Sequence, residues 1–346
     1  MLKQHQIQAV NTSIQNDFSS GVHFHATGAG KSWIGLEIIL KFIEKYPNKN
    51  ILWLCEQKSI LVEQFNKDKL KERGFSDVNK KFLVFNFSEV KDDKWVSNLN
   101  MSKCWMKPKL VIINRAYLTS MERYKKLSLP FDLIIHDECH SISNATTRNF
   151  YNFINEQNQN IKCIGFSATP NLDLFPFNKT LSSYSTFHAV RDNIILPPII
   201  KWFTSNKPLE HIEIAQLVHD LTDDLVYKKL IIWCGMIQLC NELAELWSTI
   251  FRNFDIAIDT SVDNNMNYLT YNEFVDKETN AILFCAGKHR EGSDIKNLDC
   301  CVFLDKVDDR SPRVFTQCMG RVLRKDKLNN KKVGLIIDVK AKSSFS

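Results

Sequence analysis

The segment GVHFHATGAGKSWIGLEIIL (residues 21–40) joins a short extended stretch, a glycine-containing loop and an amphipathic stretch. Its centre, HATGAGKS (25–32), has the form of the phosphate-binding pattern G-x-x-x-x-G-K-[ST], except that His25 stands at the first glycine. Gly28 and Gly30 would let backbone N–H groups face phosphate oxygens. Lys31 can reach the β- and γ-phosphates, and the Ser32 hydroxyl can ligate Mg²⁺. A loop of this kind between a strand and a helix predicts a nucleotide site.

The first half of the chain alternates short apolar runs with longer amphipathic stretches. The apolar runs predict buried parallel strands; they are NILWLC (50–55), KLVIIN (109–114), LIIH (133–136) and KCIGFS (162–167). Helical spacing of apolar residues predicts helices packed on such a sheet; it occurs in SWIGLEIILKFIEKY (32–46) and SILVEQFNKDKLKERG (59–74). This alternation predicts a doubly wound α/β fold.

The same rhythm restarts in the second half. The strand-like runs are KKLIIWCG (228–235), FDIAID (254–259), AILFCAG (281–287), CCVFLDK (300–306) and VGLIIDV (333–339), and QLCNELAELWSTIF (238–251) is helix-like. Residues 171–200, interrupted by Pro176, Pro197 and Pro198, are predicted to cross between domains. We therefore expect two α/β domains, 1–195 and 196–346.

Composition excludes several classes of protein. Of 346 residues, 44% are hydrophobic and 24% charged, as in ordinary globular proteins. No apolar run approaches the ~20 residues that span a bilayer, and MLKQHQIQAV (1–10) lacks a signal-peptide core, so we expect an intracellular protein without a membrane partner. The ten cysteines are scattered without a C-x-x-C pair, which favours small buried side chains over a metal centre. The net charge of +6 permits a polyanionic partner without demonstrating one.

Two further segments carry chemistry. In FDLIIHDECHSI (131–142), an apolar run delivers Asp137 and Glu138 at the carboxyl end of a predicted strand. Asp137 can hold Mg²⁺, and Glu138 can polarise an attacking water. In QCMGRVLR (317–324), Arg321 and Arg324 are predicted to lie one helical turn apart on one face. Arginines supplied by a second domain can stabilise the γ-phosphate during hydrolysis.

The order of these motifs resembles the superfamily 2 helicases, in the branch with DEAH/DECH-type ATPases and type III restriction motor subunits. ATGAGKS (26–32) resembles motif I, where the family often lacks the first glycine. DECH (137–140) resembles motif II, and SAT (167–169) resembles motif III. REGSDI (290–295) resembles motif V, and QCMGRVLR resembles motif VI. LKQHQIQAV (2–10) is similar to the family's adenine-reading segment, and HAVRDNIILPP (188–198) to the segment that enters the second lobe. The resemblance covers nearly the whole chain.

The resemblance implies two RecA-like lobes with ATP and Mg²⁺ in the cleft between them. The residues it implies for nucleotide contact are Gln6 for adenine, the loop residues Thr27, Gly28, Ala29, Gly30, Lys31 and Ser32, and Gly292 and Asp294 near the nucleotide and its ribose. Ser32 and Asp137 are the implied Mg²⁺ ligands, and Arg321 and Arg324 the implied γ-phosphate contacts. The implied nucleic-acid contacts are Lys58, Ser59, Arg115, Thr119, Ser167 and Thr169.

The sequence also departs from the family. Ala286 stands where many relatives carry a threonine that touches the nucleic-acid backbone, which removes one hydroxyl contact worth about 1 kcal/mol. The motif Ia stretch CEQKSILVEQ (55–64) is loose. No nuclease pattern or zinc knuckle is present, so we expect a near-minimal motor whose specificity could come from a protein partner or a further domain.

We therefore predict an ATP-dependent nucleic-acid helicase or translocase, with DNA favoured over RNA as the partner. A duplex translocase that does not separate strands is an alternative in the same class. A nucleic-acid-binding scaffold with a weak ATPase is a rival from another class, but Lys31, Asp137, Glu138, Arg321 and Arg324 are all present. A metabolic kinase does not fit the second-half arginine motif.

Overall fold

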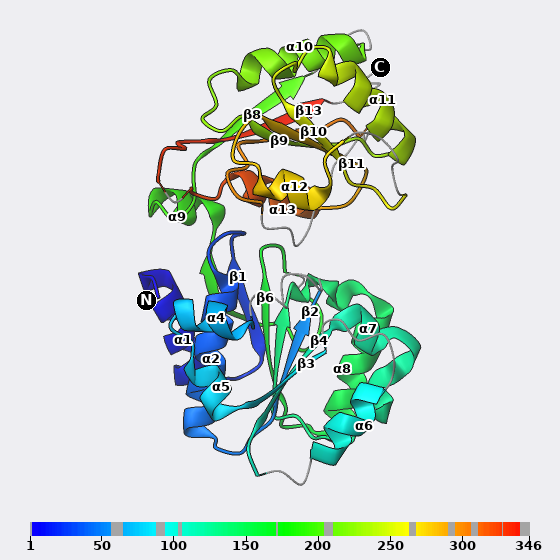
Figure 1. Cartoon of the computed structure of the whole chain (residues 1–346). Helices are drawn as coiled ribbons and strands as arrows, with labels where there is room; N and C mark the ends of the chain where they lie inside the picture. The colour runs from blue at the N-terminus through cyan, green and yellow to red at the C-terminus, as the bar shows by residue number, and fades with distance from the viewer. Residues whose placement is uncertain are drawn as a thin grey trace. The chain divides into compact units, whose positions relative to one another are not determined.

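The structure is a computed structural model that describes residues 2–56, 65–87, 94–102, 106–170, 172–203, 210–262, 268–289, 295–305, 311–326 and 328–339. The chain divides into two compact units, Met1–Thr186 and Phe187–Ser346. The boundary predicted from the sequence, between residues 195 and 196, lies within the second of these units. Each unit has its own parallel sheet (Figure 1).

The first unit contains a seven-stranded sheet with the order β3-β4-β2-β5-β6-β1-β7. Every paired neighbour in it is parallel. Its strands are β1 (Gly21–His25), β2 (Ile51–Cys55), β3 (Leu83–Phe87), β4 (Lys109–Asn114), β5 (Leu133–Asp137), β6 (Lys162–Ser167) and β7 (Thr180–Tyr184). The predicted runs at 50–55, 109–114, 133–136 and 162–167 are thus strands, and the predicted α/β class is confirmed.

Helices cover both faces of this sheet, as Figure 1 shows. One face carries α1 (Gln4–Gln15), α2 (Lys31–Lys45), α4 (Lys67–Glu72) and α5 (Asp77–Lys81); the other carries α6 (Lys94–Met101), α7 (Arg115–Thr119) and α8 (Ala145–Gln157). The 3₁₀ turns are η2 (Ser120–Lys126) and η3 (Cys139–Ser143).

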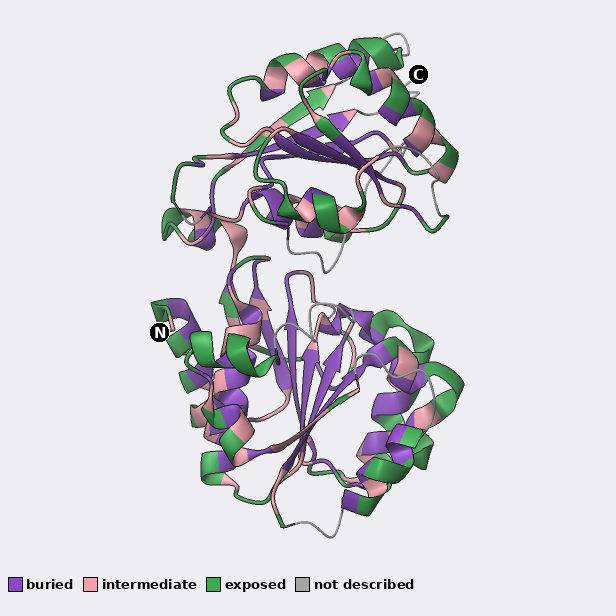
Figure 2. Ribbon diagram, viewed as in Figure 1, coloured by how far each residue is buried: buried purple, intermediate pink, exposed green. Residues whose placement is uncertain are grey.

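The two faces bury alternate residues of the same strands. In β2, Trp53 packs in the core under α2, whereas Leu52 and Leu54 pack in the core under α8. Such a strand is apolar along its whole length because both of its faces are covered. Figure 2 shows the central strands of both sheets as mostly buried.

The second unit has a six-stranded parallel sheet in the order β10-β11-β9-β12-β13-β8. Its strands are β8 (Pro198–Phe203), β9 (Lys229–Trp233), β10 (Asp255–Ile258), β11 (Ala281–Cys285), β12 (Cys300–Phe303) and β13 (Gly334–Val339). Its helices are α9 (Thr186–Arg191), which begins at the unit boundary, α10 (His211–Thr222), α11 (Ile237–Ser248), α12 (Tyr271–Asp276) and α13 (Pro312–Val322). All five predicted strand runs of the second half are strands, and the predicted helix at 238–251 corresponds to α11.

Two sequence-based predictions about local structure need correction. Residues 171–200 are not simply a crossing segment, because β7 pairs with β1 in the first sheet and β8 begins at Pro198 in the second. Proline is tolerated there because β8 lies at a sheet edge. The helix predicted through 59–74 is shorter in the described part: Asn66 has an extended backbone and caps α4, its side chain accepting a hydrogen bond from Asp68 N at 2.9 Å.

The nine cysteines in the described part of the chain are all free and buried. This agrees with the predicted role of cysteine as a small core residue. No group of three or more His, Cys, Asp or Glu side chains that could hold a metal ion occurs among the described residues.

Candidate active site

The phosphate loop lies between the end of β1 at His25 and the start of α2 at Lys31. Gly28 and Gly30 have φ values of 84° and 80°, in the left-handed region that glycine adopts without steric cost. Gly30 is the N-cap of α2, so the first N–H groups of that helix face the loop. The loop therefore presents backbone donors and the positive end of a helix dipole, as an anion site requires.

Gln6 and His5 of α1 contact this loop through the same carbonyl oxygen. Gln6 Nε2 donates to Ala29 O at 3.1 Å, and His5 Nε2 lies 2.9 Å from the same oxygen. Gln6 Oε1 accepts from Lys3 N at 2.8 Å, and Gln6 is 5% exposed. The structure thus places Gln6 against the phosphate loop, with both ends of its amide bonded within the protein. Its predicted contact with adenine stays a prediction.

Gly30→Ala tests how strongly this contact constrains the loop. An added Cβ would lie 2.3 Å from Gln6 Nε2, and φ is +80°. We expect the left-handed backbone to cost about 1–2 kcal/mol of stability, the clash to add to this, and nucleotide affinity to fall. Urea unfolding and titration with a fluorescent ATP analogue measure the two effects.

Gly74→Ala is the matched control for that substitution. Gly74 has φ +79°, but nothing lies within 4 Å of its added Cβ. It should lose only the backbone contribution and keep nucleotide affinity. Equal effects of the two substitutions would mean that the contact with Gln6 does not constrain the loop.

His25, at the position of the missing glycine, is a packing residue of β1. It is 1% exposed, and its Nε2 lies 2.8 Å from Ser182 Oγ of β7. Burial, with smaller contributions from neighbouring charges, lowers the pKa of His25 to about 3, so the ring is neutral at physiological pH. The side chain packs against Ser182 and Tyr184 of β7, which explains how a histidine is compatible with a phosphate-loop backbone.

The DECH segment follows β5, whose last residue is Asp137. Glu138 has φ 56° and ψ 48°, a left-handed conformation that costs a non-glycine residue about 1–2 kcal/mol. Strain of this kind persists where the surrounding structure fixes it, and it is concentrated at functional sites. It turns the chain sharply from the strand into η3 and leaves the Glu138 side chain 24% exposed.

Lys31 and Glu138 come together from the two motifs. Lys31 Nζ lies 3.8 Å from Glu138 Oε1 and 3.5 Å from the carbonyl oxygen of His25. β1, β6 and β5 are neighbours in the sheet, and Asp137 is in register with Phe166 near the end of β6. The carboxyl ends of three adjacent strands thus bring the loop lysine and the acidic pair to one place, where open α/β sheets bind ligands.

Asp137 is a partly buried residue whose carboxyl group lies beside a second carboxylate. Burial, followed by the negative charge of Glu138, raises the pKa of Asp137 to about 7. A divalent cation beside the carboxylate would favour its ionised form. Thr27 Oγ1 and Thr169 Oγ1 are buried and have no hydrogen-bond partner among the residues that the structure describes. Orphaned buried oxygens at the ends of β1 and β6 fit a site that receives a polar ligand.

The SAT segment is tied to the DECH segment by His140. His140 Nδ1 lies 3.2 Å from Glu138 Oε2 and 3.3 Å from Ser167 Oγ. Ser167 Oγ also accepts from Thr169 N at 3.0 Å. Ser167 is fully buried, so its predicted direct contact with nucleic acid does not fit this structure. His140 lies within the DECH motif, but the sequence does not predict its role, because only the fold brings it to Ser167.

Arg115 and Thr119 are also engaged inside the protein instead of at the surface. Arg115 Nη2 donates to Glu56 Oε2 at 2.8 Å, Arg115 Nε donates to the other oxygen, and Nη1 donates to Thr147 Oγ1 at 3.0 Å. Thr119 Oγ1 donates to Arg115 O at 3.1 Å. Both residues are buried, so their predicted backbone contacts with nucleic acid do not fit the structure.

Glu56→Gln tests the buried pair with Arg115. Burial would raise the pKa of Glu56, but its interactions with His136 and Arg115 lower it to about 2. The ionised carboxylate therefore stabilises the fold above the unfolded pKa, and this contribution is lost as pH falls from about 4.5 toward 2. We expect a loss of about 3–5 kcal/mol at pH 7 and a smaller loss at pH 3, measured by urea unfolding. An equal loss at both pH values would contradict an ionised Glu56.

Four predicted site residues lie outside the described residues. They are Lys58 and Ser59 of the motif Ia stretch and Gly292 and Asp294 of motif V. Ala286, the noted departure from the family, directly follows β11 and is partly buried against the core of the second unit.

The two arginines of QCMGRVLR do not share a helix face. α13 ends at Val322, and Arg321 lies in its last turn, 6% exposed. Leu323 is the C-cap, and its carbonyl oxygen accepts from Leu196 N at 2.8 Å. Arg324 therefore lies beyond the end of the helix, and the prediction of one helical turn is wrong. The tertiary contact of Leu323 ends the helix earlier than the sequence pattern indicates.

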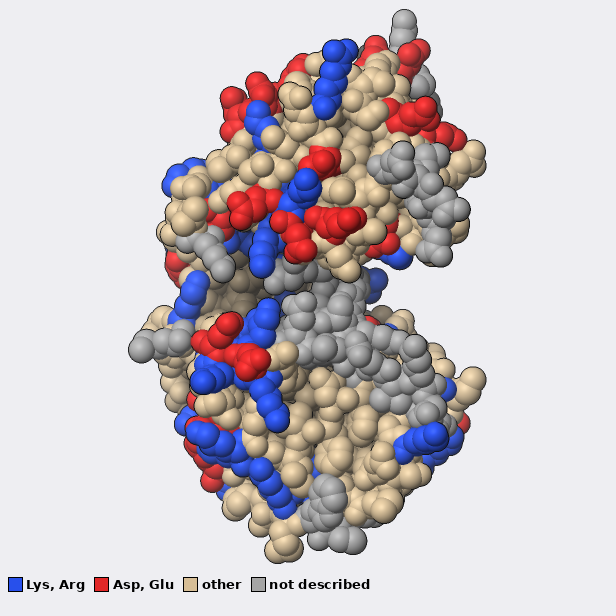
Figure 3. Space-filling view, viewed as in Figure 1, with Lys and Arg blue, Asp and Glu red and all other residues tan. Residues whose placement is uncertain are grey.

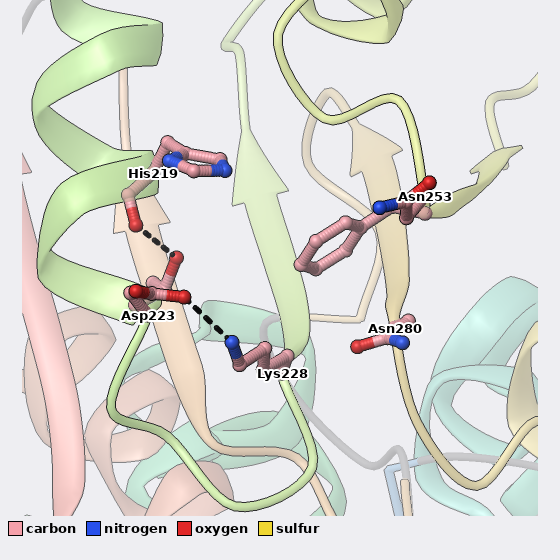
Figure 4. A pocket seen from close by; sticks show the side chains of 7 residues that line it. His219, Asp223, Lys228, Asn253 and Asn280 are labelled. Carbon is pink, nitrogen blue, oxygen red and sulfur yellow. Dashed lines mark hydrogen bonds and ion pairs between the residues drawn. The ribbon is translucent and has the colours of Figure 1, made fainter.

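A small polar pocket of about 160 Å³ lies in the second unit, and its lining includes none of the described motif residues of that unit (Figure 4). Its lining includes residues just before β9, β10 and β11, namely Lys228, Phe254 and Asn280. Lys228 Nζ donates to Asp223 Oδ1 at 2.7 Å within it. The pocket is thus at the amino ends of the strands, whereas α13 begins after the carboxyl end of β12.

Two parallel sheets, the first with a phosphate loop at the end of β1 and an acidic pair at the end of β5, define the class of RecA-like nucleotide-binding motors. Residues 1–172 match the model of the family described as type III restriction enzyme, res subunit. This match and the shared fold confirm the resemblance to superfamily 2 helicase-type motors. No curated protein matches the chain.

Solved structures share the fold. The type ISP restriction-modification enzyme LlaBIII bound to DNA has a TM-score of 0.71 and 16% identity over all of this chain and 28% of that one. A fragment of a putative HsdR subunit of a type I restriction enzyme from Vibrio vulnificus YJ016 has a TM-score of 0.69 and 18% identity over 97% of this chain and 63% of that one. S. cerevisiae Dbp5 bound to RNA and ADP BeF3 has a TM-score of 0.64 and 12% identity over 99% of this chain and 84% of that one.

The chain therefore spans less than two thirds of the length of the two restriction proteins. Among the described residues, no helix combines the length and apolar character that a membrane crossing needs.

Proposed function

We propose that this chain is a nucleic-acid-dependent ATPase motor that moves on or unwinds DNA. The observation that carries the proposal is the meeting of Lys31 and Glu138, with Asp137, at the ends of β1 and β5. A lysine for the phosphates, a carboxylate for a metal and a second carboxylate for water are the groups that ATP hydrolysis requires.

The roles follow from the position of each group. Gly28 and Gly30 let the loop backbone surround the β- and γ-phosphates, and Lys31 contacts them as a point charge. Ser32 and Asp137 would hold Mg²⁺, which neutralises charge on the phosphates when bound. Glu138, beside Asp137 and partly exposed, orients and deprotonates the attacking water.

The second unit contributes Arg321 and Arg324 in this proposal. Guanidinium groups stabilise the charge that spreads over the transferred phosphoryl group. A site completed by a second domain couples hydrolysis to domain closure, and closure to a change of grip on the nucleic acid. Contacts should be mostly to phosphate and sugar, and hence weakly sequence-specific.

The similar proteins support a nucleic-acid partner more strongly than the net charge of this chain does. LlaBIII was solved with DNA and Dbp5 with RNA, and the match to a restriction-enzyme family favours DNA. In the view of Figure 3, lysines and arginines are interspersed with acidic residues on both units. The net charge therefore supports but does not carry the proposal. Partner domains or subunits could supply specificity, since the chain spans only part of the restriction proteins.

Unwinding and translocation are separated by two displacement assays. A helicase releases the labelled strand of a tailed duplex, whereas a duplex translocase releases only a third strand bound to an intact duplex. The family match favours neither over the other. ATP binding without turnover on any substrate would instead favour the scaffold with a vestigial ATPase.

A further inference from the structure

Four aromatic rings form a continuous stack on the second sheet. Trp233 stacks on Phe303 with centroids 5.0 Å apart, and Phe303 stacks on Phe315 of α13 at 5.8 Å. Phe315 in turn stacks on Trp202 at 5.8 Å, with 14° between the ring planes. The interplanar angles are 26° or less throughout, so the rings are nearly parallel along the whole stack.

The strand register produces this arrangement. Trp233 pairs with Phe303, Phe303 with Asp338, and Asp338 with Trp202, so the four residues form one row across β9, β12, β13 and β8. Three of them are aromatic, and the fourth is the buried Asp338. Phe315 from α13 stacks on both Phe303 and Trp202 and so connects the rings on either side of Asp338. Trp233 and Phe303 are the last residues of their strands, so the row lies at the carboxyl ends.

The stack runs from the core to the surface. Trp233 and Phe303 are fully buried, Phe315 is half-buried, and Trp202 is 50% exposed. β8, which carries Trp202, is the last strand of the sheet order. The indole is thus fixed in orientation by Phe315 on one side while half of its surface faces solvent.

We propose that Trp202 is a stacking surface for a base of single-stranded nucleic acid; this inference rests on the proposed function. A base on the exposed part of the indole would extend the row of nearly parallel rings, and base–aromatic stacking tolerates any sequence. Lys201, next to Trp202 on β8, and Arg313, two residues before Phe315 on α13, are exposed and add positive charge near the outer end of the stack. The predicted contact of Gln6 with adenine lies in the other unit, so the proposal gives this surface to the nucleic acid.

The test compares variants of the whole chain in binding a single-stranded oligonucleotide that contains 2-aminopurine. Trp202→Ala should weaken binding by about 5-fold to 100-fold and remove the part of the 2-aminopurine quenching that stacking causes. Trp202→Phe should restore most of both. The slope of affinity against salt concentration should stay that of the wild type, because stacking releases no counterions.

Two further variants keep the test decisive. Trp202→Leu retains apolar volume against Phe315 but has no π face, so it should bind as weakly as Trp202→Ala. It takes the place of Trp202→Ala in the test if the alanine variant folds poorly. Phe187→Ala removes a 72% exposed aromatic ring from α9 of the same unit and should bind as the wild type does.

Each other outcome overturns the inference. Wild-type affinity in Trp202→Ala and Trp202→Leu would exclude stacking at this surface while leaving the proposed function in place. A loss of ATP affinity with unchanged oligonucleotide affinity would assign the indole to adenine. Failure of the wild type to bind any oligonucleotide, together with an ATPase that nucleic acid does not stimulate, would overturn the proposed function as well.

Discussion

Glu138→Gln is expected to lower kcat for ATP hydrolysis by about a hundredfold or more while ATP affinity stays near that of the wild type. Glutamine has the shape of glutamate and can still meet Lys31 and His140, which lie 3.8 and 3.2 Å from the carboxylate oxygens. It cannot take a proton from water. Steady-state turnover and titration with a fluorescent ATP analogue separate the two quantities.

Glu122→Gln is the matched control for this substitution. Glu122 also has a left-handed backbone, with φ 50°, but its side chain is exposed and bonds Lys125 on η2. Removing its charge should leave turnover unchanged. Normal turnover by Glu138→Gln would show that Glu138 is not the base and would direct attention to another group at the ends of β5 and β6.

Lys31→Ala is expected to reduce ATP turnover by at least about a hundredfold and also to weaken ATP binding. Lys31 is buried, and its ammonium group lies 3.8 Å from a carboxylate oxygen of Glu138. Without it, the loop keeps its backbone donors but loses the charge that meets the phosphates. The same two assays measure both effects, and thermal unfolding checks the fold.

Lys41→Ala, on the same helix, is the control for the lysine. Lys41 is exposed and pairs with Glu37 and Glu44. Surface pairs of this kind contribute about 0–1 kcal/mol, so turnover should not change. If Lys31→Ala turned over ATP at the wild-type rate, the loop would not be the phosphate site.

The strands that position the site were predictable because both of their faces are buried. The runs ending at Asp137 and Ser167 are apolar almost throughout, and parallel strands packed on both sides leave this signal in the sequence. The glycines of the loop were predictable for a related reason, since a left-handed backbone restricts the residue type.

What the sequence could not predict depends on residues that meet only in the fold. Arg115 follows a strand and resembles a phosphate contact, but Glu56, 59 residues earlier, neutralises it. β7 was not predictable because it is an edge strand whose sequence, TLSSY, is polar and lacks an apolar run. The strand of Trp202 was not predictable for a similar reason: it begins at Pro198, directly after Pro197, where the prolines suggested a connection between domains.

The central claim, an ATPase coupled to nucleic acid, is tested most directly by steady-state ATP hydrolysis without nucleic acid and then with single-stranded DNA, duplex DNA, single-stranded RNA and duplex RNA. The proposal predicts low turnover alone and strong stimulation by DNA, with none of it remaining in Glu138→Gln. Folded protein that binds ATP and hydrolyses it equally slowly under all five conditions would contradict the claim.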